Sequence, residues 1–310
     1  MIEQARRGDR RALGRLISLV ENRRPGEEQV LAALYPNAGQ AWTTGLTGAP
    51  GAGKSTLVDR LIEVLRKRGS EVAVLAVDPS SPFTGGAILG DRVRMQRHID
   101  DAGVYIRSMA SRGQLGGISE ATPRAVAVLD GMGFPEILIE TVGVGQAEVE
   151  IAATADTSIV VLNPGWGDSV QAAKAGLLEI GDIFVVNKAD RAGVNDTIRD
   201  LKQMLELGGH GAWWPPVVAT VATSGEGIDE LAGAIDEHRA HLETTGELAK
   251  LRRRHALGLL DSAVDAELHR RLETVRDHRA WERIRDEVAG RRIDPWTAAR
   301  RLVGGESSPQ

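Results

Sequence analysis

The chain has 310 residues, of which 42% are hydrophobic and 26% charged, so it is long enough for one large globular domain with appended elements. A formal net charge of -5 gives no overall basic balance, and we therefore expect neither nucleic acid nor an anionic membrane surface as a partner. There is no cysteine, which excludes disulfides, thiolate metal sites and cysteine nucleophiles, and the lack of a signal-peptide pattern or a bilayer-length apolar stretch predicts a cytoplasmic protein.

The predicted elements begin with helices and continue as an alternation of strands and helices. In the first forty residues, Leu13, Leu16, Ile17 and Val20 lie at helical spacing, and Pro25-Gly26 interrupts the pattern. Seven short apolar runs follow between residues 42 and 240, separated by amphipathic segments. They predict strands at Thr43–Thr47, Val72–Val77, Val104–Met109, Glu136–Glu140, Ser158–Leu162, Ile183–Asn187 and Val217–Thr220. This alternation is typical of an α/β fold with a mostly parallel central sheet and helices on both faces.

The residue composition and hydrophobic pattern change again after Thr245, where no strand pattern remains. The segment is rich in Arg, Glu, Leu and Ala, and it predicts helices that are interrupted at Gly290. A new helix is expected at Asp294-Pro295, with Asp as N-cap and Pro in the first turn. We expect a helical extension over residues 1–40, a nucleotide-binding type of domain over 41–245 and a helical arm over 246–310.

A phosphate-binding loop is predicted directly after the first strand. The pattern G-x-x-x-x-G-K-[ST] is matched by Gly48, Ala49, Pro50, Gly51, Ala52, Gly53, Lys54 and Ser55, and Thr56 follows in the predicted helix. Its glycines let successive backbone N–H groups turn inward, and the helix N-terminus adds further N–H groups. We expect Lys54 to reach the β- and γ-phosphates of a bound nucleotide and Ser55 to ligate Mg²⁺. These residues predict a P-loop fold.

A base-reading loop is predicted where the strand Ile183–Asn187 ends, because Asn187-Lys188-Ala189-Asp190 matches N-K-x-D. The Asp190 carboxylate can accept hydrogen bonds from N1–H and the 2-amino group of guanine, a donor pair that adenine lacks. The stem of Lys188 can pack along the base, and Asn187 can connect the loop to the phosphate loop. Ala222 and Thr223 follow the next strand and are expected to back the base, with a plain turn as the alternative. The ligands predicted are therefore GTP, GDP and Mg²⁺.

Acidic residues at two strand ends are candidate magnesium and switch residues. Glu140 ends an apolar strand and Gly143 follows three residues later, a pattern that resembles a switch segment: the acid can hold Mg²⁺ and the Gly143 N–H can sense the γ-phosphate. A helix-capping acid is the alternative for Glu140. Asp78 ends another strand, and Asp91 follows it as a second magnesium or water-positioning acid, with a turn or capping role as its alternative.

The predicted catalytic set of Lys54, Asp78, Asp91, Glu140 and Gly143 lacks an obvious water-orienting glutamine. In small signalling GTPases a glutamine directly follows the switch glycine, whereas here that position is Val144 and Gln146 comes two residues later. We therefore expect slow intrinsic GTP hydrolysis that a partner stimulates. Candidate arginine fingers, by proximity in sequence alone, are Arg92, Arg94, Arg107 and Arg112.

Taken in order, these motifs resemble the family of MeaB and the methylmalonic aciduria type A protein, formerly described as arginine/ornithine transport ATPases. The string Glu-Thr-Val-Gly-Val-Gly-Gln is the most specific part of the likeness, which extends over most of the chain. The matching segments are Gly48–Thr56, Val77–Ser81, Gly86–Met95, Ser111–Gly117, Glu140–Gln146, Asn163–Asp168, Asn187–Asp190 and Asp294–Ala299.

The resemblance implies a GTPase that acts as a chaperone for an adenosylcobalamin-dependent acyl-CoA mutase. It implies that GTP binding and hydrolysis gate cofactor loading and protect the mutase, that Pro164–Lys174 contacts the mutase, and that the helices after Leu248 form a homodimer arm. The chain departs from the common family pattern at Trp166 and at Ser169-Val170. Isobutyryl-, hydroxyisobutyryl-, ethylmalonyl- and methylmalonyl-CoA mutases are therefore all open as partners.

Three other functions compete with this interpretation. A nickel-delivery GTPase would be expected to carry Cys or His ligands, which argues against it here because there is no cysteine and no His cluster in the sequence. A transport-accessory ATPase or kinase would bind ATP, which the N-K-x-D motif opposes. A non-catalytic scaffold is disfavoured by the complete phosphate-loop pattern.

Overall fold

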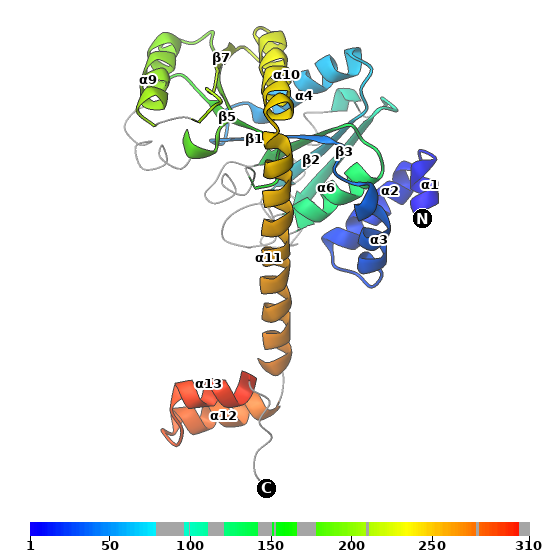
Figure 1. The fold of residues 1–310 in the computed structure, drawn as a ribbon, viewed down its shortest axis with the longest axis vertical. Coiled ribbons are helices and arrows are strands. Elements are labelled where there is room, and N and C mark those ends of the chain that lie inside the picture. Colours follow the sequence, from blue (N-terminus) through cyan, green and yellow to red (C-terminus); the bar gives the residue numbers. More distant parts are fainter. Residues whose placement is uncertain are drawn as a thin grey trace. The chain divides into compact units, whose positions relative to one another are not determined.

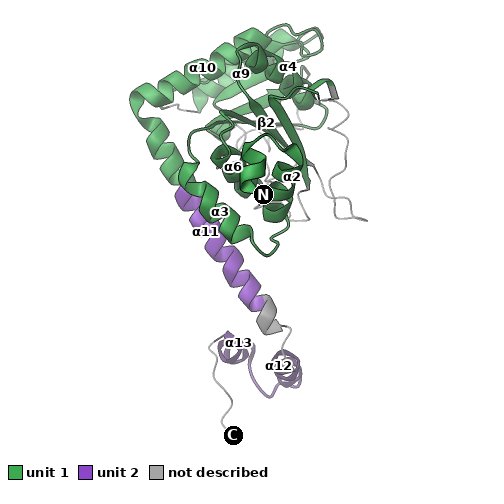
Figure 2. Cartoon of the chain, turned by 90° about the vertical axis from the view of Figure 1, so that its right-hand side faces the viewer, with its two compact units in different colours: residues 1–255 green, residues 256–310 purple. Residues whose placement is uncertain are grey.

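The structure is a computed structural model that describes residues 1–78, 96–98, 100–110, 121–141, 151, 153–165, 178–208, 211–276 and 279–303. The chain divides into two compact units, residues 1–255 and 256–310, which are coloured separately in Figure 2. The three-part division expected from the sequence stays a prediction. Among the described helices, none is long and apolar enough to cross a membrane.

The first unit is built on a seven-stranded parallel sheet, which confirms the predicted α/β class (Figure 1). The strands are β1 (Trp42–Gly48), β2 (Val72–Asp78), β3 (Val104–Ala110), β4 (Glu136–Thr141), β5 (Thr157–Leu162), β6 (Ile183–Asn187) and β7 (Val217–Thr220). Their order across the sheet is β3-β2-β4-β1-β5-β6-β7. Because all pairings are parallel, the carboxyl ends of the strands lie at one edge of the sheet.

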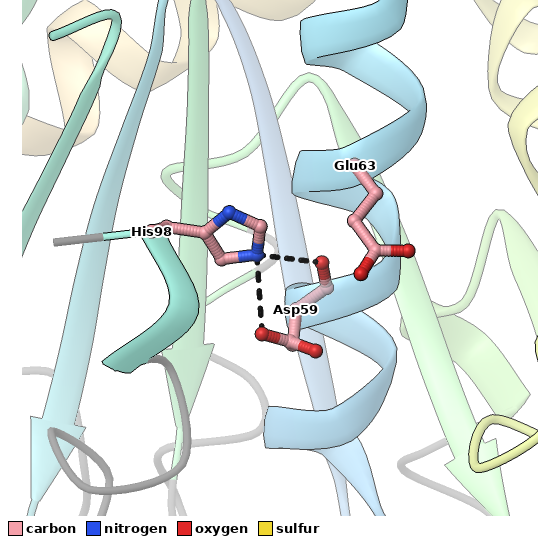
Figure 3. Close-up of side chains that lie close together, drawn as sticks. All are labelled: Asp59, Glu63 and His98. Atoms are coloured by element: carbon pink, nitrogen blue, oxygen red, sulfur yellow. Dashed lines mark hydrogen bonds and ion pairs between the residues drawn. The ribbon is translucent and has the colours of Figure 1, made fainter. Parts of the chain in front are cut away.

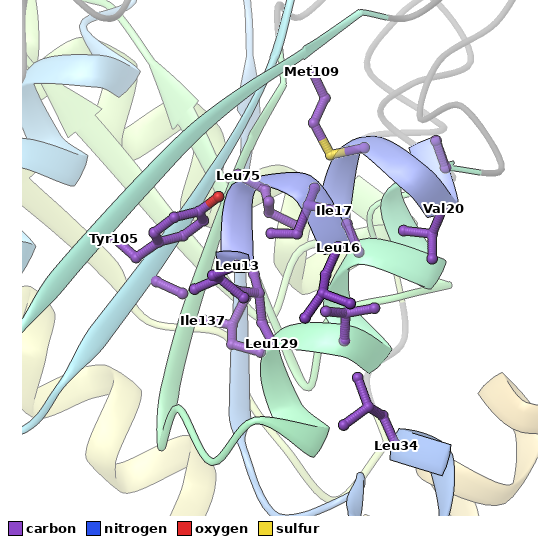
Figure 4. Close-up of a cluster of buried hydrophobic side chains, with 14 of the residues drawn as sticks. Leu13, Leu16, Ile17, Val20, Leu34, Leu75, Tyr105, Met109, Leu129 and Ile137 are labelled. Atoms are coloured by element: carbon purple, nitrogen blue, oxygen red, sulfur yellow. The ribbon is translucent and has the colours of Figure 1, made fainter. Parts of the chain in front are cut away.

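The central strands of this sheet are largely apolar on both faces, because helices cover both. Helices α4 (Lys54–Lys67) and α10 (Ile228–Thr245) pack on one face against alternate strand residues such as Leu46, Val74 and Leu138. The intervening residues, such as Leu75 and Ile137, face α2 (Arg10–Glu21) and α6 (Ala121–Gly131), as Figure 4 shows. Helix α9 (Val194–Leu207) covers β5 and β6 on that second face. Burial on both faces explains why the strand sequences are continuous apolar runs.

The N-terminal helices belong to the first unit and complete its second face. They are α1 (Ile2–Arg6), α2, α3 (Glu27–Leu34) and the short 3-10 helix η1 (Tyr35–Asn37). Asp9 caps α2, because its carboxylate accepts from the N–H groups of Arg11 and Ala12 at 2.8 and 3.0 Å. The predicted interruption lies between α2 and α3, where Gly26 adopts the left-handed region with φ of 99°.

Helix α11 (Glu247–Arg276) has 30 residues and continues from the first unit into the second. Near the start of this helix, Arg252 holds it to the rest of the first unit by donating from Nε and Nη2 to the two carboxylate oxygens of Asp156, both at 2.9 Å. The second unit also contains α12 (Arg279–Ala289) and α13 (Pro295–Val303). Asp294 caps α13 by accepting from the Thr297 N–H at 2.9 Å, which agrees with the helix start predicted at Asp294-Pro295.

Candidate nucleotide site

The predicted phosphate loop connects β1 to α4 at the carboxyl edge of the sheet. Three of its glycines have positive φ: Gly48 at 132°, Gly51 at 75° and Gly53 at 96°. A Cβ on Gly48 would lie 2.1 Å from the Val161 carbonyl oxygen of the neighbouring strand, so no side chain fits there. The backbone therefore turns sharply between the end of β1 and the first turn of α4, the arrangement that directs N–H groups toward a phosphate.

The two polar residues at the start of α4 are both buried. Lys54 lies over the loop, and its Nζ donates to the carbonyl oxygens of Gly48 at 2.7 Å and Ala49 at 3.0 Å. Ser55 Oγ donates to Glu140 Oε1 at 2.6 Å. This contact forms because β4 lies beside β1, with Glu140 in register with Leu46. A hydroxyl and a carboxylate are the hard oxygen donors that Mg²⁺ prefers, so the pair fits the predicted metal.

Asn187 at the end of β6 connects the phosphate loop to the segment after β7. Its Nδ2 donates to the Ala52 carbonyl oxygen at 2.7 Å. Its Oδ1 accepts from Thr220 Oγ1 and from the Ala222 N–H, both at 3.1 Å. The side chain is 2% exposed, so these three hydrogen bonds are shielded from water. This is the connection to the phosphate loop expected from the sequence.

The rest of the base-reading loop lies beside the phosphate loop. Lys188 has a φ of 60°, which is uncommon for a residue other than glycine and is a feature found at functional sites. Its Nζ donates to the Gly51 carbonyl oxygen at 2.5 Å. The Ala189 N–H donates to Thr220 O at 3.0 Å, which fixes the loop against the end of β7, and Asp190 is exposed at its tip.

Residues 221–225 form a tight turn after β7. The Ser224 and Gly225 N–H groups donate to the Val221 carbonyl oxygen at 3.0 and 2.9 Å. Ala222 is 3% exposed and Thr223 is exposed. The turn is thus adjacent to Asn187, and the role of Ala222 and Thr223 in backing the base stays a prediction.

The structure describes only part of the predicted switch set. Asp78 is the last residue of β2, which pairs with β4, but its side chain lies outside the described part of the chain. Asp91, Gly143 and residues 166–174 also lie outside the described residues. Of the candidate arginine fingers, only Arg107 is described, and its Nη2 contacts Glu21 Oε2 at 2.6 Å and Ser18 Oγ at 2.8 Å on α2. Arg107 is therefore engaged with the N-terminal helices.

Sequence reasoning missed a group of charged residues on α4 close to these loops. Arg60 donates to the carbonyl oxygens of Ala222 at 3.0 Å and Thr223 at 2.7 Å. Asp59 is buried and contacts His98, whose burial lowers the pKa of its imidazole below the usual value. Arg60 and Ala222 are 162 residues apart in the chain, and Asp59 and His98 are 39 residues apart, so no local sequence pattern could indicate either contact.

The fold and the arrangement of these loops define a P-loop nucleotide-binding protein. The chain belongs to the MeaB family: residues 13–277 match the family model described as methylmalonyl-CoA mutase-associated GTPase MeaB. This confirms the family resemblance seen in the sequence. The family and the names of the relatives indicate a GTPase.

Individual relatives extend the likeness over most of the chain. A protein of Pyrococcus abyssi, named provisionally as a GTPase, is 51% identical over 282 residues, 87% of each chain. The mouse protein named methylmalonic aciduria type A homolog, mitochondrial, is 35% identical over 79% of this chain and 64% of its own. A crystal structure titled LAO/AO transport system kinase superposes with a TM-score of 0.71 and 27% identity, covering 98% of this chain and 95% of the other.

Proposed function

We propose that this protein is a cytoplasmic, Mg²⁺-dependent GTPase that acts as a chaperone for an adenosylcobalamin-dependent acyl-CoA mutase. The observation that carries the nucleotide part is the set of hydrogen bonds that joins the phosphate loop and the start of α4 to the base-reading loop and to the end of β4. Asn187 contacts Ala52 of the phosphate loop, Lys188 contacts Gly51, and Ser55 contacts Glu140. The mutase part is supported by the family description and by the name of the mouse relative.

The roles of the residues follow from their chemistry. The loop N–H groups and the N-terminus of α4 would hold the phosphates, with Lys54 at the β- and γ-phosphates. Ser55 and Glu140 would hold Mg²⁺, which neutralises charge on the transferred phosphoryl group when it is bound. Asp190 would accept from the guanine N1–H and 2-amino groups.

The switch part of the proposal concerns Asp78, Asp91 and Gly143. Asp78 and Asp91 would add carboxylates toward the metal and the attacking water, and the Gly143 N–H would contact the γ-phosphate. Since no glutamine follows that glycine, we propose slow hydrolysis in the free protein and faster hydrolysis on the mutase. GTP and GDP states would then differ in how they admit the cobalamin cofactor to the mutase.

GTP turnover with and without purified mutases tests this proposal. We expect hydrolysis of GTP, not ATP, that rises when the cognate methylmalonyl-, isobutyryl-, hydroxyisobutyryl- or ethylmalonyl-CoA mutase is added. Lys54→Ala should abolish nucleotide binding, and unchanged GTP affinity would contradict the phosphate-loop assignment. Equal use of ATP would favour the transport-accessory alternative, and no response to any mutase would remove the chaperone role.

We also propose that the protein is a homodimer through α11. Large apolar side chains recur on this helix at intervals of three or four residues, the spacing of one helix face. They are Leu257, Leu260, Val264, Leu268 and Leu272, with exposed fractions of 49%, 58%, 49%, 53% and 38%. A second copy of the same helix presents the same stripe, so pairing of two copies would remove both from water.

Mass measurement in solution tests the dimer. The native chain should have twice its monomer mass of 33.2 kDa, and Leu260→Glu with Leu268→Glu should halve it by placing charges in the stripe. The control is Leu207→Glu, which changes a leucine that is 88% exposed on α9 and should leave the mass unchanged. A monomeric native chain would contradict the proposal.

A further inference from the structure

Asp59 and Glu63 on α4, the helix that follows the phosphate loop, form a cluster of titratable side chains with His98 (Figure 3). Asp59, Glu63 and His98 have potential ligand atoms within 4.8 Å of one another, a spacing that a divalent cation could use. Cations of the protein itself, however, already face both carboxylates. Arg97 contacts Asp59 Oδ2 and lies 3.1 Å from Glu63 Oε1, and Arg60 Nη1 lies 3.0 Å from Glu63 Oε2.

Two carboxylates and two guanidinium groups balance in charge, so this cluster is an ion-pair network and not a vacant cation site. Glu63 is the shared member, because it contacts Arg60 from the same helix and Arg97 from the short 3-10 helix η2 (Gln96–His98). Through Arg60 the network is also connected to the turn after β7.

Arg60 grips the turn after β7 through two main-chain acceptors. Its Nε donates to Ala222 O at 3.0 Å and its Nη2 donates to Thr223 O at 2.7 Å. The planar guanidinium presents these two donors in a fixed fork, which a lysine ammonium cannot reproduce. Glu63 accepts from the remaining Nη1 at 3.0 and 3.3 Å and thereby fixes the plane of the fork.

The same turn is held from the opposite side by Asn187. The Ala222 N–H donates to Asn187 Oδ1 at 3.1 Å, and Asn187 also contacts the phosphate loop. The turn therefore has two side-chain anchors, one belonging to the base-reading loop and one belonging to α4. Removal of the Arg60 anchor would free the Ala222 and Thr223 carbonyls while leaving the phosphate loop and its contact with Asn187 intact.

We propose that Arg60, oriented by Glu63, is a positioning residue for guanine recognition. It acts through residues 221–225, which back the base, and has no role at the phosphates. This inference rests on the proposed function, because it assumes that the loop beside Asp190 receives guanine. It predicts a split that a general loss of stability would not produce: affinity for the base falls while affinity for the phosphate chain is kept.

The test measures binding of GDP and of inorganic tripolyphosphate to the full chain with Mg²⁺ by calorimetry. Arg60→Ala should weaken GDP binding about ten-fold, the effect of losing a charge-assisted contact, and change tripolyphosphate binding less than about two-fold. Arg68→Ala is the matched control: it removes an arginine at the end of the same helix, whose Nη1 contacts Asp236 Oδ2 at 2.9 Å on α10. This control should bind both ligands as the native chain does.

Two further variants keep the test decisive if Arg60→Ala folds poorly. Arg60→Lys keeps the charge but cannot span both carbonyls, and should lose most of the same GDP affinity. Glu63→Gln should give a smaller loss of the same kind. Native GDP affinity in Arg60→Lys and Arg60→Ala, or an equal loss of tripolyphosphate and GDP affinity, would overturn the assignment. If the native chain itself bound GDP no better than ADP, the proposed function would fail instead.

Discussion

Replacing Asn187 by alanine removes a side chain that contacts both the phosphate loop and the turn after β7. The amide makes three hydrogen bonds, to Ala52 O at 2.7 Å and to Thr220 Oγ1 and the Ala222 N–H at 3.1 Å each. The side chain is 2% exposed, so water does not readily replace it. The substitution therefore leaves buried partners on three different segments.

The size of the effect follows from these three bonds. A buried hydrogen bond contributes about 1 kcal/mol net, and a partner left unsatisfied costs about 1–3 kcal/mol. Three bonds with partial relaxation of the loops give a loss of about 3 kcal/mol in the free energy of unfolding for Asn187→Ala. Because the bonds connect the phosphate loop to the base-reading side, we also expect GDP binding to weaken by at least about 100-fold, the equivalent of about 2.7 kcal/mol.

Urea unfolding of the nucleotide-free chain measures the first quantity, and calorimetric titration with GDP measures the second. Asn195→Ala is the matched control, since this asparagine is exposed on α9 and its loss should change stability by less than about 0.5 kcal/mol. A loss below about 1 kcal/mol for Asn187→Ala, with GDP affinity preserved, would refute the view that this amide organises the site.

Three other predictions concern single groups. Asp190→Asn should weaken GTP binding about 100-fold or more and spare xanthosine triphosphate, because the amide can donate to the xanthine 2-carbonyl; equal loss of both would exclude Asp190 as the base reader. Glu140→Gln should raise the Mg²⁺ concentration needed for GTP hydrolysis at least about ten-fold, as metal titrations of turnover would show. Burial lowers the pKa of His238 from 6.5 to about 4, with a smaller effect of His241, so the folded chain keeps the ring neutral while the unfolded chain protonates it. The stability that the neutral ring contributes is therefore complete above pH 6.5 and is lost as the pH falls toward 4. Urea unfolding at a series of pH values should show that the free energy of unfolding of the native chain falls by about 3 kcal/mol more over this range than that of His238→Gln. Asp182, whose Oδ1 lies 3.5 Å from His238 Nε2, is present in both the native protein and the variant. If their free energies of unfolding changed with pH in parallel, the prediction would be contradicted.

The sheet could be predicted from the sequence because its strands are buried on both faces. Ile183–Asn187 and Glu136–Thr141 are apolar runs that end in a polar residue; the first ends where the sequence predicts, and the second ends one residue beyond the predicted Glu140. Asp294 at the start of α13 was equally accessible, since an N-cap is set by residues two or three positions apart. The phosphate loop was found for the same reason: its glycines, Lys54 and Ser55 are contiguous.

What could not be predicted are contacts that the fold creates between distant segments. Arg60 is one of several arginines on an amphipathic helix, and nothing near it in the sequence distinguishes it from Arg68. Its role depends on two carbonyl groups more than 160 residues away, and carbonyls leave no mark in a sequence. For Ser55 and Glu140 the sequence predicted the two motifs separately but not the contact between them, because the pairing of β1 with β4 brings the two residues together.

Two glycines of the phosphate loop separate backbone strain from crowding. Gly51 and Gly53 both have positive φ, 75° and 96°, so alanine at either position costs about 1 kcal/mol for the backbone alone. A Cβ on Gly51 would meet nothing within 4 Å, whereas a Cβ on Gly53 would lie 2.2 Å from Asn187 Nδ2. That nitrogen is held by its bond to Ala52 O at 2.7 Å and cannot retreat without breaking it.

Gly51→Ala should therefore lower the free energy of unfolding of the nucleotide-free chain by about 1 kcal/mol, and Gly53→Ala by about 3 kcal/mol or more, because the clash also disrupts the bonds of Asn187. The excess belongs to the Asn187 side chain, so a double-mutant cycle isolates it. In an Asn187→Ala background, Gly53→Ala should cost only the backbone term of about 1 kcal/mol, equal to Gly51→Ala. Additive losses in the double variant would mean that the two residues act independently, and the close packing of the phosphate loop on the base-reading strand could then not be what requires glycine at position 53.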